Sequence, residues 1–174
     1  HLSIPLPAEL YGQLRANSKG LDLANDSALA QLNQTAQQFA KHQWSAAPMG
    51  EHIQTNDAVA PQSIINPARH SDVVGYVQEA TTEQVEQALN NAQAVQDIWA
   101  RTAKDTRASY LLRAADLMEA RLEELMVLLC RESGKTYANA IAEVREAVDF
   151  LRYYATQVEN LPANTAIQPL GTVL

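Results

Sequence analysis

The strongest constraint on the fold of this chain is the stretch 132–155, in which a turn ending in Gly134 and Lys135 leads into a long helical pattern closed by an aromatic pair. The periodicity predicts a helix over about 137–160, and a helix of this length needs a surface on which to bury its apolar stripe. The residues predicted to face inward are Ile141, Val144, Val148, Leu151, Ala155 and Val158. We therefore expect a mainly α-helical fold.

Three further windows have helical periodicity and a recognisable N-cap. The expected helices, with their caps, are 26–42 (Asn25 or Asp26), 81–101 (Thr81, in a capping box with Gln84) and 102–134 (Thr102 or Asp105). The last of them should end at Gly134 with a left-handed glycine C-cap.

The remaining segments are short or irregular. Residues 1–24 are punctuated by Pro and Gly and are typical of a tether, while 45–62 has no period and is expected to be a linker. The β-rich segments 64–67 and 72–80 are separated by a turn and predict a small hairpin. Residues 167–174 have the pattern of a strand without a partner.

Composition excludes some classes of function. With 13 Lys plus Arg against 20 Asp plus Glu, the net charge is −7, so we expect no nucleic-acid partner through this segment. No apolar run approaches the roughly 20 residues that span a bilayer, and the N-terminus lacks the pattern of a signal peptide. A single Cys fits a reducing compartment, and a cytoplasmic location is the default expectation.

Several residues that carry chemistry elsewhere are better explained by structure here. Cys130 lies in the helical run LMVLLC and is expected to pack, as free cysteines usually do. Gly134–Thr136 resembles the end of a phosphate loop, but Leu129 stands where such a loop needs its first glycine. Tyr153 and Tyr154 are expected to fill the core.

No metal site is expected, because the four histidines show neither i, i+4 spacing nor a link to the cysteine. They are His1, His42, His52 and His70, which we interpret as surface residues.

The order of elements over about 110 residues resembles the N-terminal part of the cofactor-binding domain of aldehyde dehydrogenases. The resemblance runs from Asn66 and Pro67 through residues 80–100 and 107–115 to the stretch 132–155. Upstream, LPAELYGQLRANSKGLDLAN resembles the segment that follows the proline dehydrogenase barrel in bifunctional proline utilization flavoenzymes. There it leads into a 1-pyrroline-5-carboxylate dehydrogenase module.

The resemblance implies a domain division and an activity. Residues 1–62 would be an inter-domain linker region with one or two helices, and 63–174 the incomplete N-terminal part of the α/β aldehyde dehydrogenase fold. The parent enzyme would oxidise proline to glutamate, with FAD in the proline dehydrogenase module and NAD in the dehydrogenase that oxidises glutamate semialdehyde. The catalytic Cys and Glu would lie beyond Leu174, so this segment would hold neither catalytic residues nor a cofactor and would be inactive alone.

The expected partners are the remainder of the parent chain, the semialdehyde and other copies in a homo-oligomer. The parent is expected in the cytoplasm or peripherally on the inner membrane. The alternative is a non-catalytic helical interaction domain whose apolar stripes bind a partner.

Glu146 is the single candidate substrate-binding residue. Its helical neighbours three and four positions away include no cation, whereas Asp149 has Arg145 and Arg152 within reach. In 1-pyrroline-5-carboxylate dehydrogenases, a Glu three residues before the Asp of a DF(L/F)R segment borders the aldehyde pocket, and the match falls on Glu146. The alternative for Glu146 is a solvated surface carboxylate.

Overall fold

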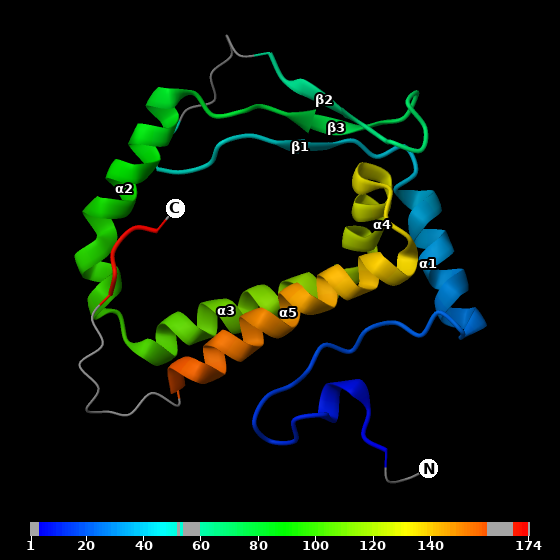
Figure 1. Cartoon of the computed structure of the whole chain (residues 1–174), viewed down its shortest axis with the longest axis horizontal. Helices are drawn as coiled ribbons and strands as arrows, with labels where there is room; N and C mark the ends of the chain where they lie inside the picture. The colour runs from blue at the N-terminus through cyan, green and yellow to red at the C-terminus, as the bar shows by residue number, and fades with distance from the viewer. Residues whose placement is uncertain (1–3, 52, 54–59, 160–168, 174) are drawn as a thin grey trace.

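The computed structural model describes residues 4–51, 53, 60–159 and 169–173. Helical elements dominate the described chain, accompanied by one small sheet (Figure 1). In chain order the elements are η1 (Pro7–Glu9), α1 (Asp26–Gln38), β1 (Trp44–Ala46), β2 (Gln62–Ile65), β3 (Val73–Val77), α2 (Thr82–Arg101), α3 (Lys104–Ala120), α4 (Leu122–Ser133) and α5 (Tyr137–Glu159). The expected mainly helical fold is confirmed.

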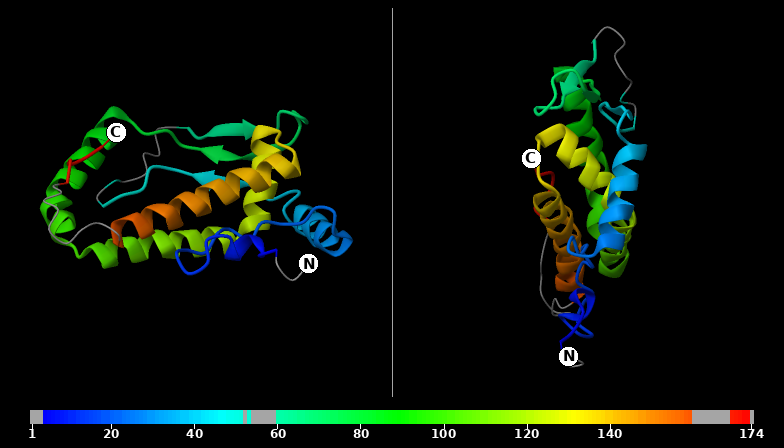
Figure 2. Two further views of the ribbon diagram at one scale, coloured as in Figure 1. Left: turned by 60° about the horizontal axis from the view of Figure 1, so that its bottom comes forward. Right: turned by 90° about the vertical axis from the view of Figure 1, so that its right-hand side faces the viewer.

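The core lies where α1, α3, α4 and α5 meet. Helices α3 and α5 run side by side, and α4 packs between α5 and α1 (Figures 1 and 2). The buried cluster consists of Leu32, Ala115, Met126, Ala140, Ile141, Val144 and Val148. Of the residues expected to face inward on α5, Ile141, Val144, Val148 and Ala155 are buried, and Leu151 and Val158 are half-buried. Leu32 brings α1 into the same core.

Helix ends follow the local chemistry of the sequence, with one exception. The Asn25 side chain accepts hydrogen bonds from two backbone N–H groups of α1, and Thr81 and Gln84 form the expected capping box. Gly134 ends α4 with φ of 67°, a left-handed conformation that glycine adopts without steric cost. The N-cap of α3 is Ala103, without a side-chain hydrogen bond, so the expected caps at Thr102 or Asp105 were wrong.

The helix expected over 102–134 is in fact two helices, α3 and α4, separated at Arg121. The backbone of Arg121 leaves the helical region, with φ of −108° and ψ of 20°. A continuous helix of this length would extend about 50 Å and carry its second half past α5. The break instead turns α4 so that Met126 and Val127 are buried. Periodicity alone does not reveal a change of helix direction.

The sheet contains one strand more than the expected hairpin. Strands β2 and β3 pair antiparallel as expected, but β1 pairs in parallel on the other side of β3, giving the order β1-β3-β2. β1 includes Ser45 and Ala46, which lie in the segment expected to be a linker. Gly75 permits the pairing, because an added Cβ there would stand 2.2 Å from the Trp44 carbonyl oxygen.

Helix α2 stands apart from the core, and its apolar stripe is open. Ile98 is 67% exposed and Val95 50% exposed, and none of the α2 residues, all of which the structure describes, is buried. Of the expected strand 167–174, Ile167, Gln168 and Leu174 lie outside the described residues. The described part, 169–173, forms no strand, because a strand requires a partner for its ladder.

Among the described residues, no helix combines the length and the apolar character needed to cross a membrane.

Candidate functional site

The segment 4–24, which precedes α1, is held against α5 by polar contacts; we call it the arm. The Ser18 backbone N–H and hydroxyl donate to the two carboxylate oxygens of Asp149, at 2.7 and 2.8 Å. Arg145 Nε donates to the same Ser18 hydroxyl at 3.1 Å, and Ser18 is only 2% exposed. The arm therefore has a defined place on α5, which the interpretation as a tether did not anticipate.

A second contact joins the arm to α3 and α5 through Glu119. Its carboxylate accepts from the Lys19 backbone N–H at 2.8 Å and from Arg152 Nη2 at 2.9 Å. Burial opposes ionisation of this carboxyl, but these hydrogen bonds hold its pKa below the ordinary value. Arg152 also pairs with Asp116 at 2.9 Å. The expected contact of Arg152 with Asp149, three residues earlier, is therefore replaced by contacts with α3.

Glu146 lies beside the arm, in a hollow of about 220 Å³. The hollow is lined by Arg15, Glu146, Asp149, Phe150 and Tyr153. Glu146 is exposed, and the described residues give it neither a hydrogen bond nor an ion pair. The structure thus gives Glu146 an unpaired carboxylate in a concave site.

The aromatic residues at this end of α5 do not fill the core, contrary to expectation. Tyr153 is 42% exposed and Tyr154 56% exposed. Tyr154 stacks against Phe150 with the ring centres 6.0 Å apart, and Tyr153 meets it edge to face at 5.3 Å. The rings form an apolar surface next to Glu146, because α5 turns its other face to α3.

Arg15 completes the hollow from the arm. Its guanidinium carbon lies 4.0 Å from the centre of the Tyr11 ring and 5.8 Å from that of Tyr153. Its Nη1 is 3.8 Å from the nearer oxygen of Asp149, which is an ion pair but too long for a hydrogen bond. Sequence reasoning missed Arg15, because it lies 131 residues from Glu146 and in a segment without periodicity.

A buried ion pair in another region was also missed. Arg131 of α4 donates to both oxygens of Asp72, at 2.7 and 3.2 Å, and to the carbonyl oxygens of Phe39 and His42, at 2.9 and 2.6 Å. Hydrogen bonds from Arg131 and Asn66 hold the pKa of the Asp72 carboxyl below its usual value. A charged residue directly after the apolar run LMVLLC was the available signal. These contacts fix α4, the end of α1 and the sheet to one another.

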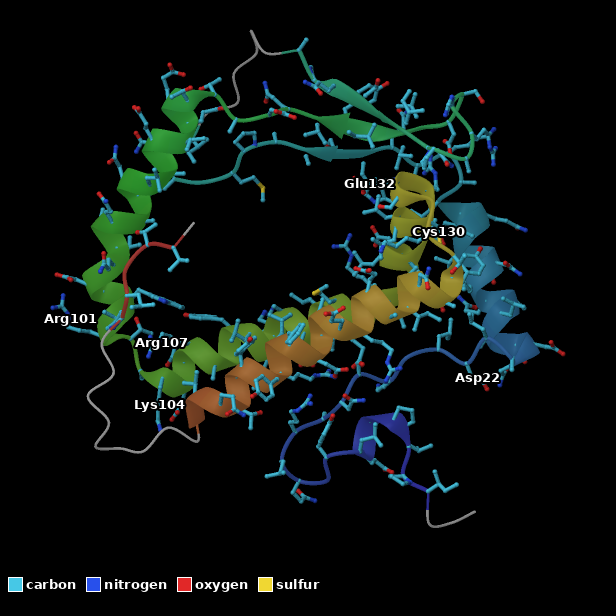
Figure 3. The ribbon with its side chains drawn as sticks, in the orientation of Figure 1. Asp22, Arg101, Lys104, Arg107, Cys130 and Glu132 are labelled. Atoms are coloured by element: carbon cyan, nitrogen blue, oxygen red, sulfur yellow. The ribbon has the colours of Figure 1, made fainter. Side chains whose placement is uncertain are left out.

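The remaining candidates have structural surroundings. Cys130 packs beside the core (Figure 3) and lines a hollow together with Ala36 and Ala40. Burial raises the pKa of its thiol. The thiol is therefore protonated at neutral pH and is not an activated nucleophile. Lys135 Nζ pairs with Glu143 at 2.6 Å.

The histidine prediction can be followed at two positions. The His42 ring lies 4.7 Å from that of Trp44, edge to face, and both His42 and His70 are exposed. His1 and His52 lie outside the described residues. Within the described ranges, no group of three His, Cys, Asp or Glu side chains gathers as metal ligands would.

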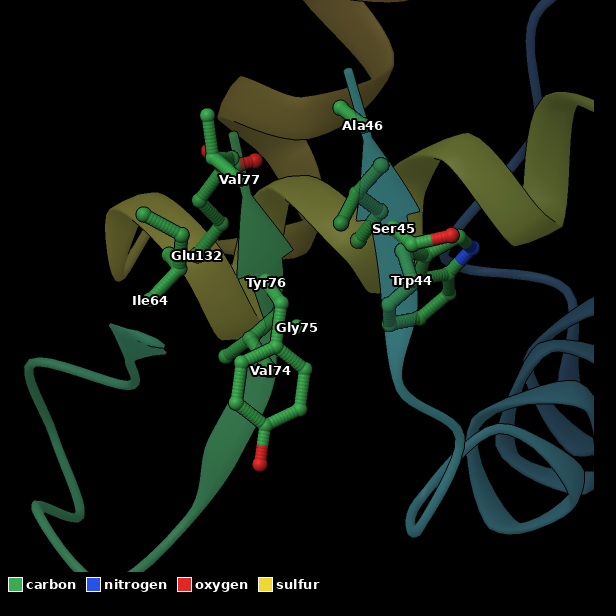
Figure 4. Close-up of a pocket in the computed structure, with 10 residues that line it drawn as sticks. Trp44, Ser45, Ala46, Ile64, Val74, Gly75, Tyr76, Val77 and Glu132 are labelled. Carbon is green, nitrogen blue, oxygen red and sulfur yellow. The ribbon is translucent and has the colours of Figure 1, made fainter. Parts of the chain in front are cut away.

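A second hollow, of about 240 Å³, lies over the sheet (Figure 4). Apolar and small side chains from β1, β2 and β3 line most of it, and Glu132 of α4 is its one ionisable carboxylate. This second hollow has few charged groups that could bind or orient a polar substrate. The hollow at Glu146 has three, Arg15, Glu146 and Asp149, and is therefore the stronger candidate site.

Helices α3 and α5, strands β2 and β3 and Glu146 all lie in the part of the chain that matches a known protein family. The model of the aldehyde dehydrogenase family matches residues 52–173. The chain belongs to the aldehyde dehydrogenase family.

Similar proteins point to one branch of this family. The chain is 51% identical to the bifunctional protein PutA of Escherichia coli K12 over 174 residues, which are 100% of the chain and 13% of that protein. It superposes with a TM-score of 0.77 and 28% identity on proline utilization A from Bdellovibrio bacteriovorus inactivated by N-propargylglycine, over 91% of the chain and 16% of that structure. For 1-pyrroline-5-carboxylate dehydrogenase from Thermus with bound NAD, the TM-score is 0.76 at 27% identity, over 88% of the chain and 30% of that structure.

Proposed function

We propose that this chain forms the first part of the dehydrogenase unit of a bifunctional proline-oxidising enzyme. The whole protein would convert proline to glutamate and oxidise glutamate γ-semialdehyde in its second step. The observation that carries this proposal is the 51% identity with the E. coli protein over every residue of the chain. The match includes the arm, which precedes the part that the family model covers.

The chemistry of the described residues indicates which part of the enzyme's work this chain can do. Thioester chemistry on an aldehyde needs an activated thiolate and a general base. Cys130 does not meet the first requirement, because burial keeps its thiol protonated. We therefore assign the nucleophile and the base to sequence beyond Leu174, and to this chain the scaffold and one wall of the substrate pocket.

The described residues do not fit a dinucleotide. Gly134 is the C-cap of α4, the Thr136 hydroxyl accepts from the Asn139 backbone N–H at the start of α5, and Lys135 is engaged with Glu143. A pyrophosphate site would need several free backbone N–H groups at a helix N-terminus. NAD therefore belongs to the later part of the dehydrogenase unit, and FAD to an upstream proline dehydrogenase. We further propose a cytoplasmic or peripheral inner-membrane homo-oligomer.

Within this function, Glu146 is the substrate-binding residue of the chain. Its carboxylate is unpaired and faces a hollow with an apolar aromatic wall. The semialdehyde carries an α-ammonium far from its reacting carbon, and a carboxylate in the wall can hold that group. Such a contact positions the aldehyde without taking part in bond making.

The test is Glu146→Ala in the full-length enzyme. The value of kcat/KM for the semialdehyde should fall about tenfold or more, the loss that follows removal of one charge-assisted contact. Glu143→Ala, one turn earlier, is the matched control, because Glu143 makes a surface pair with Lys135 and does not line the hollow. Equal kinetics for the two variants would mean that Glu146 is a solvated surface carboxylate that does not bind the substrate.

A further inference from the structure

Two adjoining hollows lie beside the turn between β2 and β3, at the end of α1 and against α4 (Figure 1). The smaller, of about 180 Å³, reaches Tyr137 at the start of α5, and the larger, of about 290 Å³, reaches Lys41 and Ser71. Both are lined by Ala40, Arg69, Asp72 and Arg131. Because they share these residues, the two hollows are continuous, and we call them together the basic cleft.

The one carboxylate that lines the basic cleft is already paired. Asp72 accepts hydrogen bonds from Arg131, at 2.7 and 3.2 Å, and from Asn66 Nδ2 at 2.9 Å. Arg131 directs its Nη1 to the backbone carbonyl oxygens of Phe39 and His42. The pair is therefore electrically neutral and hydrogen-bonded, and no further carboxylate among the described lining residues balances the other cations of the cleft.

Two cations of the basic cleft are left unbalanced. The described residues give the side chains of Arg69 and Lys41 neither a hydrogen bond nor an ion pair. The hydroxyls of Ser71 and Tyr137 likewise have no acceptor within the described ranges. The net charge of the chain is −7, so a local excess of two positive charges does not follow from the overall composition. The cleft thus presents positive charge and hydrogen-bond donors to a ligand.

The position of Arg69 is set by the turn that carries it. Its backbone N–H donates to the Asn66 carbonyl oxygen at 3.1 Å, and its own carbonyl oxygen accepts from the Asp72 N–H at 2.8 Å. Asn66 is buried, with 7% exposure, and so anchors the turn. Because the backbone is already fixed, a ligand has to order only the side chain of Arg69, which lowers the entropic cost of binding.

We propose that the basic cleft binds a phosphate group, as inorganic phosphate or as a small organic phosphate monoester. The guanidinium fork of Arg69 matches two phosphate oxygens, and Lys41 adds the second charge that a dianion requires. Each hollow is below the roughly 300–1,000 Å³ of pockets for drug-sized ligands, so the cleft suits one phosphate and not a dinucleotide. The site shares no residue with the hollow at Glu146 and does not depend on the proposed function.

The experiment measures phosphate binding to the full-length protein by calorimetry, with NAD at saturation so that the cofactor's own phosphate contacts are filled. The ionic strength is constant, and pH 8 keeps phosphate mainly dianionic. Arg69→Met should weaken binding at least about tenfold and Lys41→Met about threefold, because a flexible ammonium lacks the fork of a guanidinium. Arg113→Met is the matched control, because Arg113 is exposed on α3 and does not line the cleft. Circular dichroism verifies that each variant is folded.

Hydrogen exchange followed by mass spectrometry locates the site. Phosphate should slow exchange in residues 39–43 and 66–73 of the parent and leave α3 unchanged, because the bound anion joins the end of α1 to the turn of the sheet. Arg69→Met should abolish this protection.

Glycerol 3-phosphate and acetate are the comparison ligands. Tighter binding of inorganic phosphate would assign the cleft to the free ion, and tighter binding of glycerol 3-phosphate would assign it to an organic monoester; either result supports the inference. Acetate that binds as tightly as both would overturn it. So would a parent that does not bind millimolar phosphate, protection confined to other segments, or an Arg69→Met variant with the affinity of the parent.

Discussion

Helices α2 and α5 have similar amphipathic sequences and opposite environments. On α5 the stripe is buried, with Val148 1% exposed, whereas on α2 Val95 is 50% exposed and Ile98 67%. The difference is supplied by the partners: α5 packs against α3 and α4, while α2 touches little of the described chain (Figure 1). Periodicity therefore identifies a helix and its apolar face, but it does not say what covers that face.

A charge placed in the apolar stripe should destabilise α5 far more than α2. Val148→Asp should lower the unfolding free energy of the 174-residue chain by more than about 4 kcal/mol, because it buries a carboxylate without a partner. Val95→Asp should cost under about 1 kcal/mol, because that side chain stays half in water. Urea unfolding measures both. Similar losses would mean that α2 is covered, for example by a second copy of the chain, and that the two helices do not differ in environment.

The next prediction concerns the ion pair between Asp72 and Arg131. Arg131 and Asn66 hold the pKa of Asp72 below its ordinary value of 3.8. A carboxyl with a lowered pKa stabilises the fold above that ordinary value, and the contribution is lost as pH falls through about 4 and below. Asp72→Asn should cost about 1.5 to 3 kcal/mol at pH 7.

The measurement for Asp72 is urea unfolding between pH 3 and 7. The gap between parent and Asp72→Asn should narrow in acid, because the parent loses its charge there and the variant has none to lose. Asp97, an exposed residue on α2, provides the control, and Asp97→Asn should change stability little at any of these pH values. A constant gap for Asp72→Asn would show that its carboxylate does not contribute through ionisation.

A weaker effect is expected at the N-terminus of α2. Thr81→Ala removes the capping box of α2 and should cost that helix about 1 kcal/mol. Because α2 is not packed into the core, its local opening should become about fivefold more frequent while α5 is unaffected. Hydrogen exchange followed by mass spectrometry resolves the two helices. Slower exchange in α2 than in α5 of the parent would contradict the proposed difference in packing.

Local signals in the sequence were reliable where short-range chemistry decides the structure. The Asn25 cap, the capping box at Thr81 and the left-handed Gly134 all involve groups within four residues of one another. The strand β1 and the break at Arg121 escaped prediction, because each depends on a surface that a distant part of the chain supplies. The parallel partner of β1 lies about 30 residues later and carries no mark of the pairing except Gly75.

At the candidate site, too, local contacts could be predicted from the sequence and long-range contacts could not. Helical spacing identified Glu146 as lacking a cation on its own helix, and no other described residue pairs with it. The same spacing failed for Asp149, whose carboxylate is taken by Ser18 rather than by its neighbours on α5. Pairing between adjacent turns is weak, at about 0.2–0.5 kcal/mol, so a buried hydrogen bond from elsewhere prevails. Arg15 likewise lines the site from a segment that is distant in the sequence.

The attachment of the arm to α5 has a consequence for the order of events during synthesis. Ser18 and Asp149 are 131 residues apart. A ribosome that adds roughly 5–20 residues per second needs roughly 7–26 s to cover that interval. During this time the arm has emerged but its binding surface on α5 has not been made, and Arg15 has neither the ring of Tyr153 nor the carboxylate of Asp149 to contact. In the nascent chain the arm is therefore accessible to chaperones and proteases until α5 follows.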